Sequence, residues 1–215
     1  MTAIALPSRG VYAIADTHWL PAGKLEAGVS AALRGGVVLI QLRDKSATAL
    51  ADLQLLKRLR DRCHEYQVPF LINDHPDYAI ACQADGVHIG QTDHTDNLQQ
   101  LRRRLGEDAI IGVSCHNDLI TAQQAEAAGA SYVAFGRFFV SQTKPQAQAA
   151  SLATLREASS LLRIPCVAIG GITPDNTADV LSAGAAMVAV IGGIFNADDI
   201  ETATRRYSEK FIQPV

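Results

Sequence analysis

Hydrophobic and polar positions alternate along this chain with two different periods. Short apolar runs rich in Val and Ile are each followed by a longer segment in which Ala and Leu recur among polar residues at helical spacing. The runs predict eight strands, at residues 11–15, 37–42, 69–72, 86–89, 109–113, 132–135, 166–169 and 187–191. The segments between and after them predict helices at residues 24–34, 47–66, 76–83, 97–105, 117–128, 151–162, 175–182 and 198–211. Strands that alternate with helices are typical of a parallel sheet.

The regularity of this alternation favours a closed (β/α)8 TIM barrel. Four predicted helices are followed by small residues ahead of the next strand, at Gly35-Gly36, Ala84-Asp85-Gly86, Gly129-Ala130 and Gly184-Ala185. The 215 residues divide into units of about 27, which suits an economical barrel. An open doubly wound sheet is the alternative, but the first strand leads into residues 16–19 (DTHW) and not into GxGxxG. We expect one barrel domain over residues 1–215.

Composition narrows the class of partner. The chain is 48% hydrophobic and carries 19 Lys and Arg against 22 Asp and Glu, a net charge of -3. Disorder would need lower hydrophobicity, and nucleic-acid binding by bulk charge would need a basic excess. No apolar run reaches the ~18 residues of a membrane span, and the first ten residues lack the apolar core of a signal peptide. We expect a small-molecule partner, no nucleic acid and no membrane; a homo-oligomer stays open.

The four cysteines indicate a reducing compartment. Cys63, Cys82, Cys115 and Cys166 show no CxxC spacing, so we expect a cytoplasmic protein without disulfides. Cys115 precedes His116 at the end of the fifth strand, which suggests a Cys–His nucleophile pair. Neighbours on a strand point to opposite faces, however, so packing is the favoured role of Cys115.

Polar residues gather where the predicted strands end, the edge at which barrels of this class carry their active sites. After the second strand, alternation sends Gln41, Arg43 and Lys45 to one side. Arg grips a phosphate with two hydrogen bonds and Lys adds a point charge, so this trio predicts a site for phosphate or pyrophosphate. The alternative is a solvated charge run at a strand end.

Two carboxylates follow the third and fourth strands. Asp74 and Asp93 stand beside the predicted cationic site, and together they predict a Mg²⁺ ion held by protein carboxylates, water and phosphate oxygens. Taken singly, each is as readily a helix N-cap. His88 within the fourth strand has the chemistry of a base or a metal ligand. A histidine there is as often a satisfied core residue, and we assign it no proton transfer.

A second anion site is predicted after the last two strands. Gly170-Gly171 and Gly192-Gly193 follow the last two strands, where backbone N–H groups form the recurrent phosphate site of these barrels. Simple turn chemistry is the alternative for these glycines. The irregular stretch 136–150 is a candidate active-site loop that carries Ser141, Thr143 and Lys144. Two anion sites in one mouth suggest two phosphorylated ligands brought together.

Seven ordered motifs make the chain resemble the thiamine phosphate synthase family. They are QLRDK at 41–45, IND at 72–74, ADGVHIGQTD at 84–93, GVSCH at 112–116, FGRFFVSQTKP at 135–145, AIGGITPDN at 168–176 and AVIGGIF at 189–195. The similarity runs from Gly10 to Phe195. Enzymes of this family are (β/α)8 barrels that join a hydroxymethylpyrimidine diphosphate to a thiazole phosphate. They form thiamine monophosphate and release pyrophosphate.

The resemblance implies a role for each matching residue. The pyrimidine diphosphate would be held by Gln41, Arg43, Lys45, Asn73 and Lys144, and the pyrimidine ring would contact Ser114. Asp74 and Asp93 would bind Mg²⁺. The thiazole phosphate would be held by Ser141, Thr143, Gly171 and the backbone of Ile191 and Gly192. In this family pyrophosphate leaves first, stabilised here by Mg²⁺, Arg43, Lys45 and Lys144, and the thiazole nitrogen attacks afterwards without a strong general base.

Three positions depart from the family pattern. Ser141 stands where Thr is usual, Gly192 where many members have Ser, and Cys115 where a small residue is common; none removes a charge or a metal ligand. The related thiazole tautomerase is an alternative enzyme, sharing the barrel and the thiazole phosphate site but needing no diphosphate apparatus. A non-catalytic sensor of phosphorylated ligands is the alternative outside catalysis.

Overall fold

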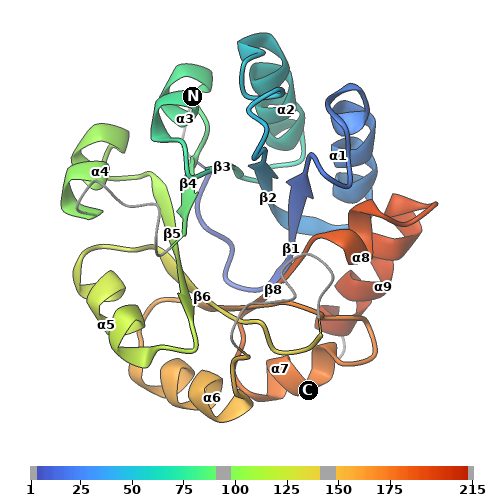
Figure 1. Cartoon of the computed structure of the whole chain (residues 1–215). Coiled ribbons are helices and arrows are strands. Elements are labelled where there is room, and N and C mark those ends of the chain that lie inside the picture. The colour runs from blue at the N-terminus through green and yellow to red at the C-terminus, as the bar shows by residue number, and fades with distance from the viewer. Residues whose placement is uncertain (1–3, 91–97, 141–148, 213–215) are drawn as a thin grey trace.

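Eight parallel strands close into a barrel, as the alternation of sequence periods predicts (Figure 1). The computed structural model describes residues 4–90, 98–140 and 149–212. The strands pair in chain order, and the last closes on the first. They are β1 (Gly10–Asp16), β2 (Val37–Arg43), β3 (Phe70–Asn73), β4 (Gly86–Ile89), β5 (Ile110–His116), β6 (Tyr132–Phe135), β7 (Cys166–Ile169) and β8 (Met187–Val190). The expected (β/α)8 barrel is thereby confirmed.

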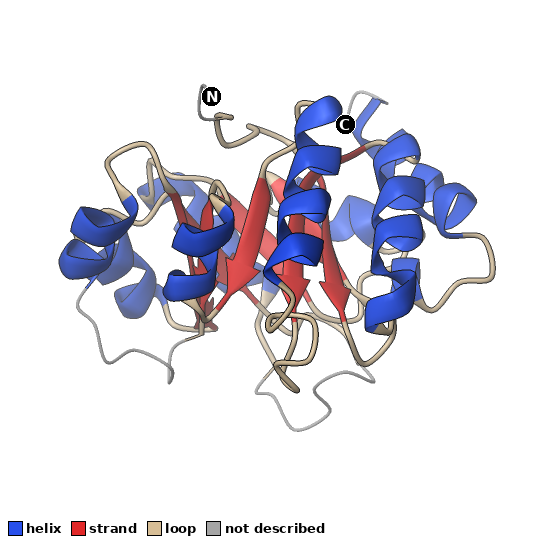
Figure 2. Cartoon of the chain, turned by 90° about the horizontal axis from the view of Figure 1, so that it is seen from above, coloured by secondary structure: helices blue, strands red, loops and turns tan. Residues whose placement is uncertain are grey.

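Helices surround the barrel, and all the strand arrows run the same way (Figure 2). The helices are η1 (Ala22–Lys24), α1 (Leu25–Arg34), α2 (Leu53–Glu65), α3 (Pro76–Cys82), α4 (Leu98–Leu105), α5 (Leu119–Ala127), α6 (Leu152–Leu161), α7 (Thr177–Ser182), α8 (Gly192–Phe195) and α9 (Ile200–Ile212). Local chemistry sets several of their ends: Asp52, Asp118 and Ser151 accept backbone N–H groups as N-caps. Within the described residues, no helix combines the length and the apolar run needed to cross a membrane.

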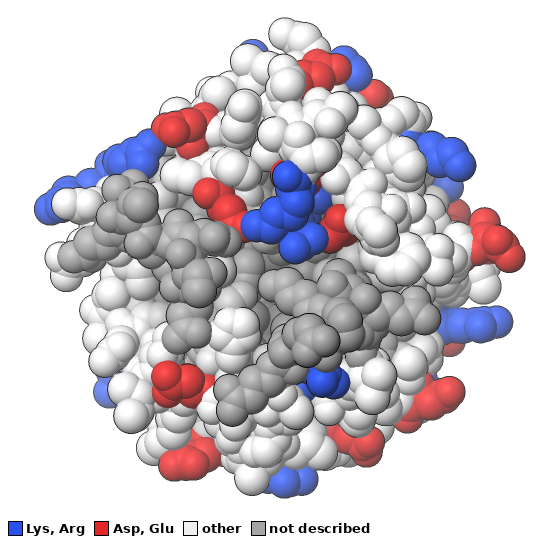
Figure 3. Space-filling view, viewed as in Figure 1, with Lys and Arg blue, Asp and Glu red and all other residues white. Residues whose placement is uncertain are grey.

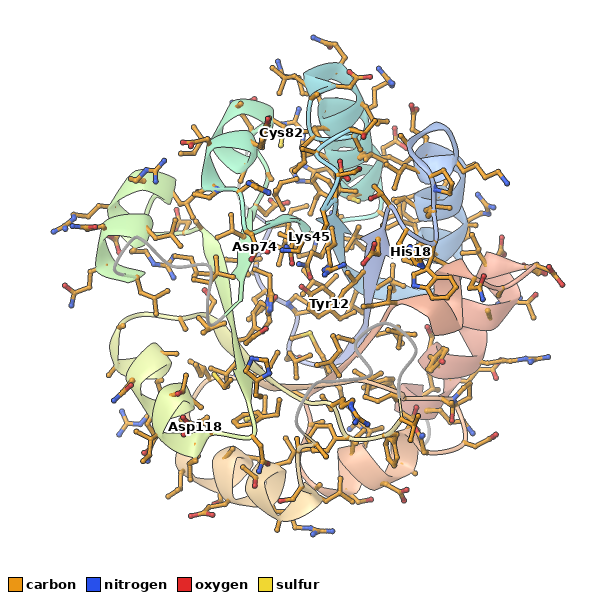
Figure 4. The ribbon with its side chains drawn as sticks, viewed as in Figure 1. Tyr12, His18, Lys45, Asp74, Cys82 and Asp118 are labelled. Atoms are coloured by element: carbon orange, nitrogen blue, oxygen red, sulfur yellow. The ribbon has the colours of Figure 1, made fainter. Side chains whose placement is uncertain are left out.

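Two layers of apolar side chains follow from strand alternation. Along β1, Val11 and Ala13 belong to the layer between the strands and the helices, whereas Tyr12 and Ile14 belong to a second cluster with Leu39. That second cluster fills the barrel interior, as the central position of Tyr12 in Figure 4 shows. Within the described residues, the interior below the mouth is therefore packed with side chains.

One helix boundary differs clearly from the prediction. The helix expected at 47–66 begins only at Leu53. The reason is the buried carboxylate of Asp44, which accepts hydrogen bonds from the backbone N–H of Ala49 at 2.6 Å and of Leu50 at 3.1 Å, and from the Ser46 hydroxyl at 2.6 Å. These bonds hold residues 46–50 in turns, because the side chain takes donors that a helix would use.

Asp44 therefore links the end of β2 to α2, and its charge is part of the link. Burial works to raise the pKa of Asp44, but hydrogen bonds from Ser46, Leu50, Thr17 and Ala49 outweigh it and lower that pKa below its usual value. A lowered pKa contributes stability that is present above the unfolded value and is lost as the pH falls through the folded value.

We expect Asp44→Asn to lower the free energy of unfolding by about 2–3 kcal/mol at neutral pH, because an amide N–H₂ would face buried donors. Urea unfolding measures the loss, with the exposed Asp198→Asn as the matched control. The difference between wild type and Asp44→Asn should shrink as the pH falls below the unfolded pKa of about 3.9 and through the lowered folded pKa, because the wild-type carboxyl then takes up a proton. A difference that stays the same from neutral pH down to the acid limit of folding would contradict this account.

Candidate active site

A cavity of about 480 Å³ opens at the carboxyl ends of the strands. It is lined by nine of the predicted site residues: Gln41, Arg43, Lys45, Asn73, Asp74, Ser114, Gly171, Ile191 and Gly192. Strand alternation explains the first three, which project inward from β2 and the residues after it. Four further predicted residues, Asp93, Ser141, Thr143 and Lys144, lie outside the described residues. The nine predicted residues that the structure describes thus line one cavity, as the sequence predicts.

Arg43 is held by a carboxylate that sequence reasoning missed. Its guanidinium donates to Asp16 at the end of β1, and Asp16 also accepts the backbone N–H of His18 at 3.0 Å. Asp16 is 2% exposed. The prediction ended the first strand at Ala15 and treated the next residues as a loop. The signal was an acidic residue directly after a strand, at the edge where the other site residues lie.

Lys45 is held by Asp74. Its Nζ lies 2.6 Å from Asp74 Oδ2, and Asp74 Oδ1 accepts the backbone N–H of Gly90 at 3.0 Å. The amide of Asn73 donates to Asp74 Oδ2 as well. Figure 4 shows Lys45 and Asp74 next to one another at the barrel mouth. Three donors on one carboxylate identify Asp74 as an acceptor at the cavity wall.

Asp74 does not serve as a helix cap. The N-cap of α3 is His75, whose side chain makes no capping bond. Asp74 instead has φ of 61°, a left-handed conformation that turns its carboxylate toward the cavity end of β3. The N-cap alternative for Asp74 is therefore wrong.

The mouth is locally polarised although the net charge is small. Figure 3, which looks onto this face, shows basic atoms gathered between acidic atoms at the centre of the mouth. The ion pairs of Arg43 with Asp16 and of Lys45 with Asp74 belong to this region. An anion that enters the cavity meets two cations already oriented by carboxylates.

The same donor set suits a divalent ion. Asp74 offers a hard carboxylate oxygen at the wall of a cavity, and Mg²⁺ typically takes one or two carboxylates together with water and phosphate oxygens. The described residues include no cluster of three or more His, Cys, Asp or Glu side chains placed to hold a metal by themselves. Asp74 therefore fits a metal that shares its coordination with a substrate and does not fit a closed protein cage.

A chain of buried polar groups runs beneath the cavity. Gln41 Nε2 donates to Asn73 Oδ1 at 2.7 Å, and the Tyr12 hydroxyl donates to Gln41 Oε1 at 2.6 Å. The Tyr12 and Tyr132 hydroxyl oxygens are 2.8 Å apart. Sequence reasoning missed both tyrosines, because they sit within apolar strands and their partners are far away in the chain.

His88 ends this chain on the side of β5. Its Nδ1 lies 2.8 Å from the Tyr132 hydroxyl and its Nε2 lies 2.9 Å from Ser114 Oγ. The His88 ring stacks on the ring of Tyr132 with centroids 5.6 Å apart. Both nitrogens have hydroxyl partners, as the interpretation of His88 as a satisfied core residue expects.

The glycines after β7 and β8 form the other wall. Gly171 has φ of 67°, and a Cβ there would lie 2.4 Å from the carbonyl oxygen of Val140. A Cβ on Gly193 would lie 2.3 Å from the hydroxyl of Tyr207, so the backbone must pass close to that side chain. The prediction placed a loop here, whereas residues 192–195 form the short helix α8. Two adjacent glycines have low helix propensity, so the sequence did not predict α8.

Further residues line the cavity without having been predicted. They include Trp19, His116, Arg137 and Tyr207. Arg137 adds a cation next to the glycine wall, and a Cβ on Gly170 would lie 2.3 Å from its Cβ. Arg137 lies just after the sixth strand, and other site residues also lie just after strands. That position was the signal from which the sequence could have predicted it.

The cysteines are structural. All four are buried and free. Cys115 Sγ donates to the carbonyl of Val113, and burial, with smaller contributions from Asp118 and Cys166, raises the pKa of its thiol to about 12. A thiol with a raised pKa is a poor nucleophile, so Cys115 packs in the core as expected.

Together, a closed barrel, paired cations at its mouth and a glycine wall after β7 and β8 define a (β/α)8 protein of the class that binds small phosphorylated molecules. The family model described as thiamine monophosphate synthase matches residues 11–194. The chain belongs to this family.

Its relatives are similar over nearly their full length. The thiamine-phosphate synthase of Nitrosococcus oceani is 52% identical over 203 residues, which cover 94% of this chain and 93% of the relative. That of Alcanivorax borkumensis is 47% identical, with 94% of both chains covered. A solved thiamine phosphate pyrophosphorylase from Pyrococcus furiosus is 34% identical and superposes with a TM-score of 0.83, covering 94% of this chain and 95% of its own.

We expect the native protein to react slowly with Ellman's reagent at about pH 8, because burial raises the pKa of each thiol. The denatured protein should release the colour of four thiols, a count that checks for disulfides. Rapid modification of Cys115 in the native protein would contradict its assignment to the core.

Proposed function

We propose that this chain condenses a hydroxymethylpyrimidine diphosphate with a thiazole phosphate to give thiamine monophosphate and pyrophosphate. The observation that carries the proposal is that Arg43, paired with Asp16, and Lys45, paired with Asp74, line the same cavity as the glycine wall. A diphosphate and a monophosphate bound at these two walls would bring their organic ends together between them. The names of the relatives support this assignment.

The first substrate is assigned to the wall formed by β2, β3 and β5. Its diphosphate would be held by Gln41, Arg43, Lys45, Asn73 and Lys144, and its pyrimidine by Ser114. The thiazole phosphate would be held by Ser141, Thr143 and Gly171 with the backbone of Ile191 and Gly192. The described members of both sets line the same cavity, which supports the division.

Asp74 and Asp93 are the residues that would hold Mg²⁺. When bound, this ion supplies positive charge that stabilises pyrophosphate as a leaving group. The hard oxygens of Asp74 at the cavity wall support the assignment.

The protein's own part in the reaction is electrostatic. The bond from the pyrimidine methylene to oxygen breaks, and its electron pair leaves with pyrophosphate, whose charge Arg43, Lys45 and Lys144 stabilise. The thiazole nitrogen then donates its lone pair to the methylene carbon, which closes the new C–N bond. Neither step transfers a proton to the protein, so no general base is needed. His88 has hydroxyl partners at both ring nitrogens, which agrees with a histidine that transfers no proton in the reaction.

We place the protein in the cytoplasm, where free thiols persist and small phosphorylated substrates are available. The thiazole tautomerase alternative is disfavoured by the presence of Arg43, Lys45 and Asp74 around the cavity. That activity would have no use for a diphosphate site.

One assay separates the alternatives. The protein is mixed with both substrates and Mg²⁺, and thiamine monophosphate and pyrophosphate are measured by chromatography. We expect both products in equal amounts. Isomerised thiazole phosphate alone would identify a tautomerase, and ligand binding without product would identify a sensor; either result overturns the proposal.

We expect Asp74→Asn and Asp93→Asn each to lower kcat about 100-fold or more and to raise the Mg²⁺ concentration needed for half-maximal rate. The matched control is Asp77→Asn, which removes an acidic group of α3 whose side chain is 85% exposed. Unchanged kinetics in both site variants would remove the metal assignment.

We expect Lys144→Ala to weaken binding of the pyrimidine diphosphate at least about tenfold, because a charge-assisted contact contributes about 1.5–3 kcal/mol. The thiazole phosphate should bind almost as before. Calorimetric titration with each substrate tests the difference, and equal weakening of both would place Lys144 elsewhere.

A further inference from the structure

Eight polar groups form one continuous hydrogen-bonded chain from the cavity wall, through the barrel interior, back to the cavity wall. It runs from Ser114 through His88, Tyr132, Tyr12, Gln41 and Asn73 to Asp74, which also accepts from Lys45. Tyr12 and Tyr132 are each about 1% exposed or less, and His88 is 8% exposed. Tyr12 and Tyr132 have no part in the proposed chemistry, and neither does the ring of His88.

Each hydrogen bond in the chain has a donor and an acceptor, and this donor-to-acceptor direction is fixed at the Asp74 end. A carboxylate only accepts, so Asn73 must turn its amide Nδ2 toward Asp74, as observed. Asn73 Oδ1 then faces Gln41, which must donate from Nε2. The remaining Gln41 atom, Oε1, can only accept, and its partner is the hydroxyl of Tyr12.

The two phenols carry this direction across the barrel. Burial raises the pKa of Tyr12 and of Tyr132 well above the usual value, so each keeps its one hydroxyl hydrogen. The hydrogen of Tyr12 is used on Gln41, so Tyr12 accepts from Tyr132. The hydrogen of Tyr132 is thereby used, and Tyr132 accepts from His88 Nδ1.

The two ring nitrogens of His88 connect the buried hydroxyl of Tyr132 to Ser114 at the cavity. In a neutral imidazole with its hydrogen on Nδ1, the other nitrogen, Nε2, is an acceptor. The hydroxyl of Ser114 lies 2.9 Å from Nε2. The Ser114 hydrogen therefore points inward to His88, and the lone pairs of Ser114 Oγ remain for the cavity that this residue lines.

We propose that Tyr12, Tyr132 and His88 are positioning residues that make Ser114 a hydrogen-bond acceptor, and that this orientation selects a substrate with an N–H donor at that point. The choice of ligand rests on the proposed function: an aminopyrimidine presents such a donor in its exocyclic amino group. An analogue with oxygen in place of that amino group presents an acceptor to the same oxygen and is disfavoured.

The orientation is tested first without any ligand. Nitrogen-15 NMR of the histidine rings distinguishes the two tautomers, and we expect the Nδ1–H form for His88 in the wild type. Tyr12→Phe removes a hydroxyl that bonds to Tyr132 and Gln41, which frees the Tyr132 hydrogen to donate to His88. We therefore expect the His88 ring to shift toward the Nε2–H form in Tyr12→Phe, and further in Tyr132→Phe.

Tyr66→Phe is the matched control, because Tyr66 is 39% exposed and lies after α2, outside the chain of hydrogen bonds. It should leave the His88 tautomer unchanged. An Nε2–H ring in the wild type, or an Nδ1–H ring that persists in both Tyr12→Phe and Tyr132→Phe, would overturn the proposal. A merely packing role of the tyrosines predicts that persistence.

Selectivity is tested with the uncharged pyrimidine alcohol and its oxygen-substituted analogue, titrated by calorimetry without Mg²⁺. We expect the wild type to prefer the amino compound and Tyr12→Phe to lose about tenfold of that preference, the worth of one hydrogen bond. Tyr66→Phe should keep it. An unchanged preference in Tyr12→Phe refutes the selective role. If the tautomer behaves as expected but the synthase assay yields no product, the orientation stands and the proposed function fails.

Discussion

The carboxylate of Asp74 is the point on which the organisation of the cavity depends. It accepts from Lys45, from the backbone of Gly90 and from Asn73, so it ties together residues that follow β2, β3 and β4. It holds Lys45, the proposed substrate-binding cation, in place, fixes the direction of the buried polar chain and is the described member of the proposed metal pair. These three uses share one physical cause, an acceptor-only group at the place where neighbouring strands of a closed barrel end.

Pairing each cation with a carboxylate has a consequence for binding. An unpaired Arg or Lys at the cavity wall would be drawn toward bulk water, at a cost in side-chain order when the ligand arrives. Asp16 and Asp74 hold Arg43 and Lys45 near their working positions instead. Lys45 is half-exposed, so breaking its ion pair with Asp74 costs little free energy. A diphosphate carries more negative charge than one carboxylate, so Lys45 would gain by turning to it. The ion pairs thus orient the site without closing it to the ligand.

Sequence patterns predicted the barrel and the wall residues, because both follow from local rules. Alternation along β2 was enough to send Gln41 and Arg43 to one side, and the position after a strand was enough to place Asp74. The missed features depend on contacts between distant segments. Tyr12 and Tyr132 are 120 residues apart and look like core aromatics until the closed barrel brings their hydroxyls together. The late start of α2 has a local cause instead, the turn in which the Asp44 carboxylate accepts from the backbone of Ala49 and Leu50.

The buried polar chain gives the ordered hydroxyls of the barrel interior a purpose in a site for which we propose no general base. A barrel interior filled with apolar side chains would be simpler to pack, and each buried polar group is costly unless it is satisfied. Here every link from Asp74 to Ser114 is made with a hydrogen-bonding partner, so the cost of burial is offset. What the chain adds is direction: a carboxylate at one side of the mouth determines which way a hydroxyl points at the other. In the proposed reaction, which depends on charge stabilisation and alignment, the orientation of the Ser114 hydroxyl would decide which ring is held in line.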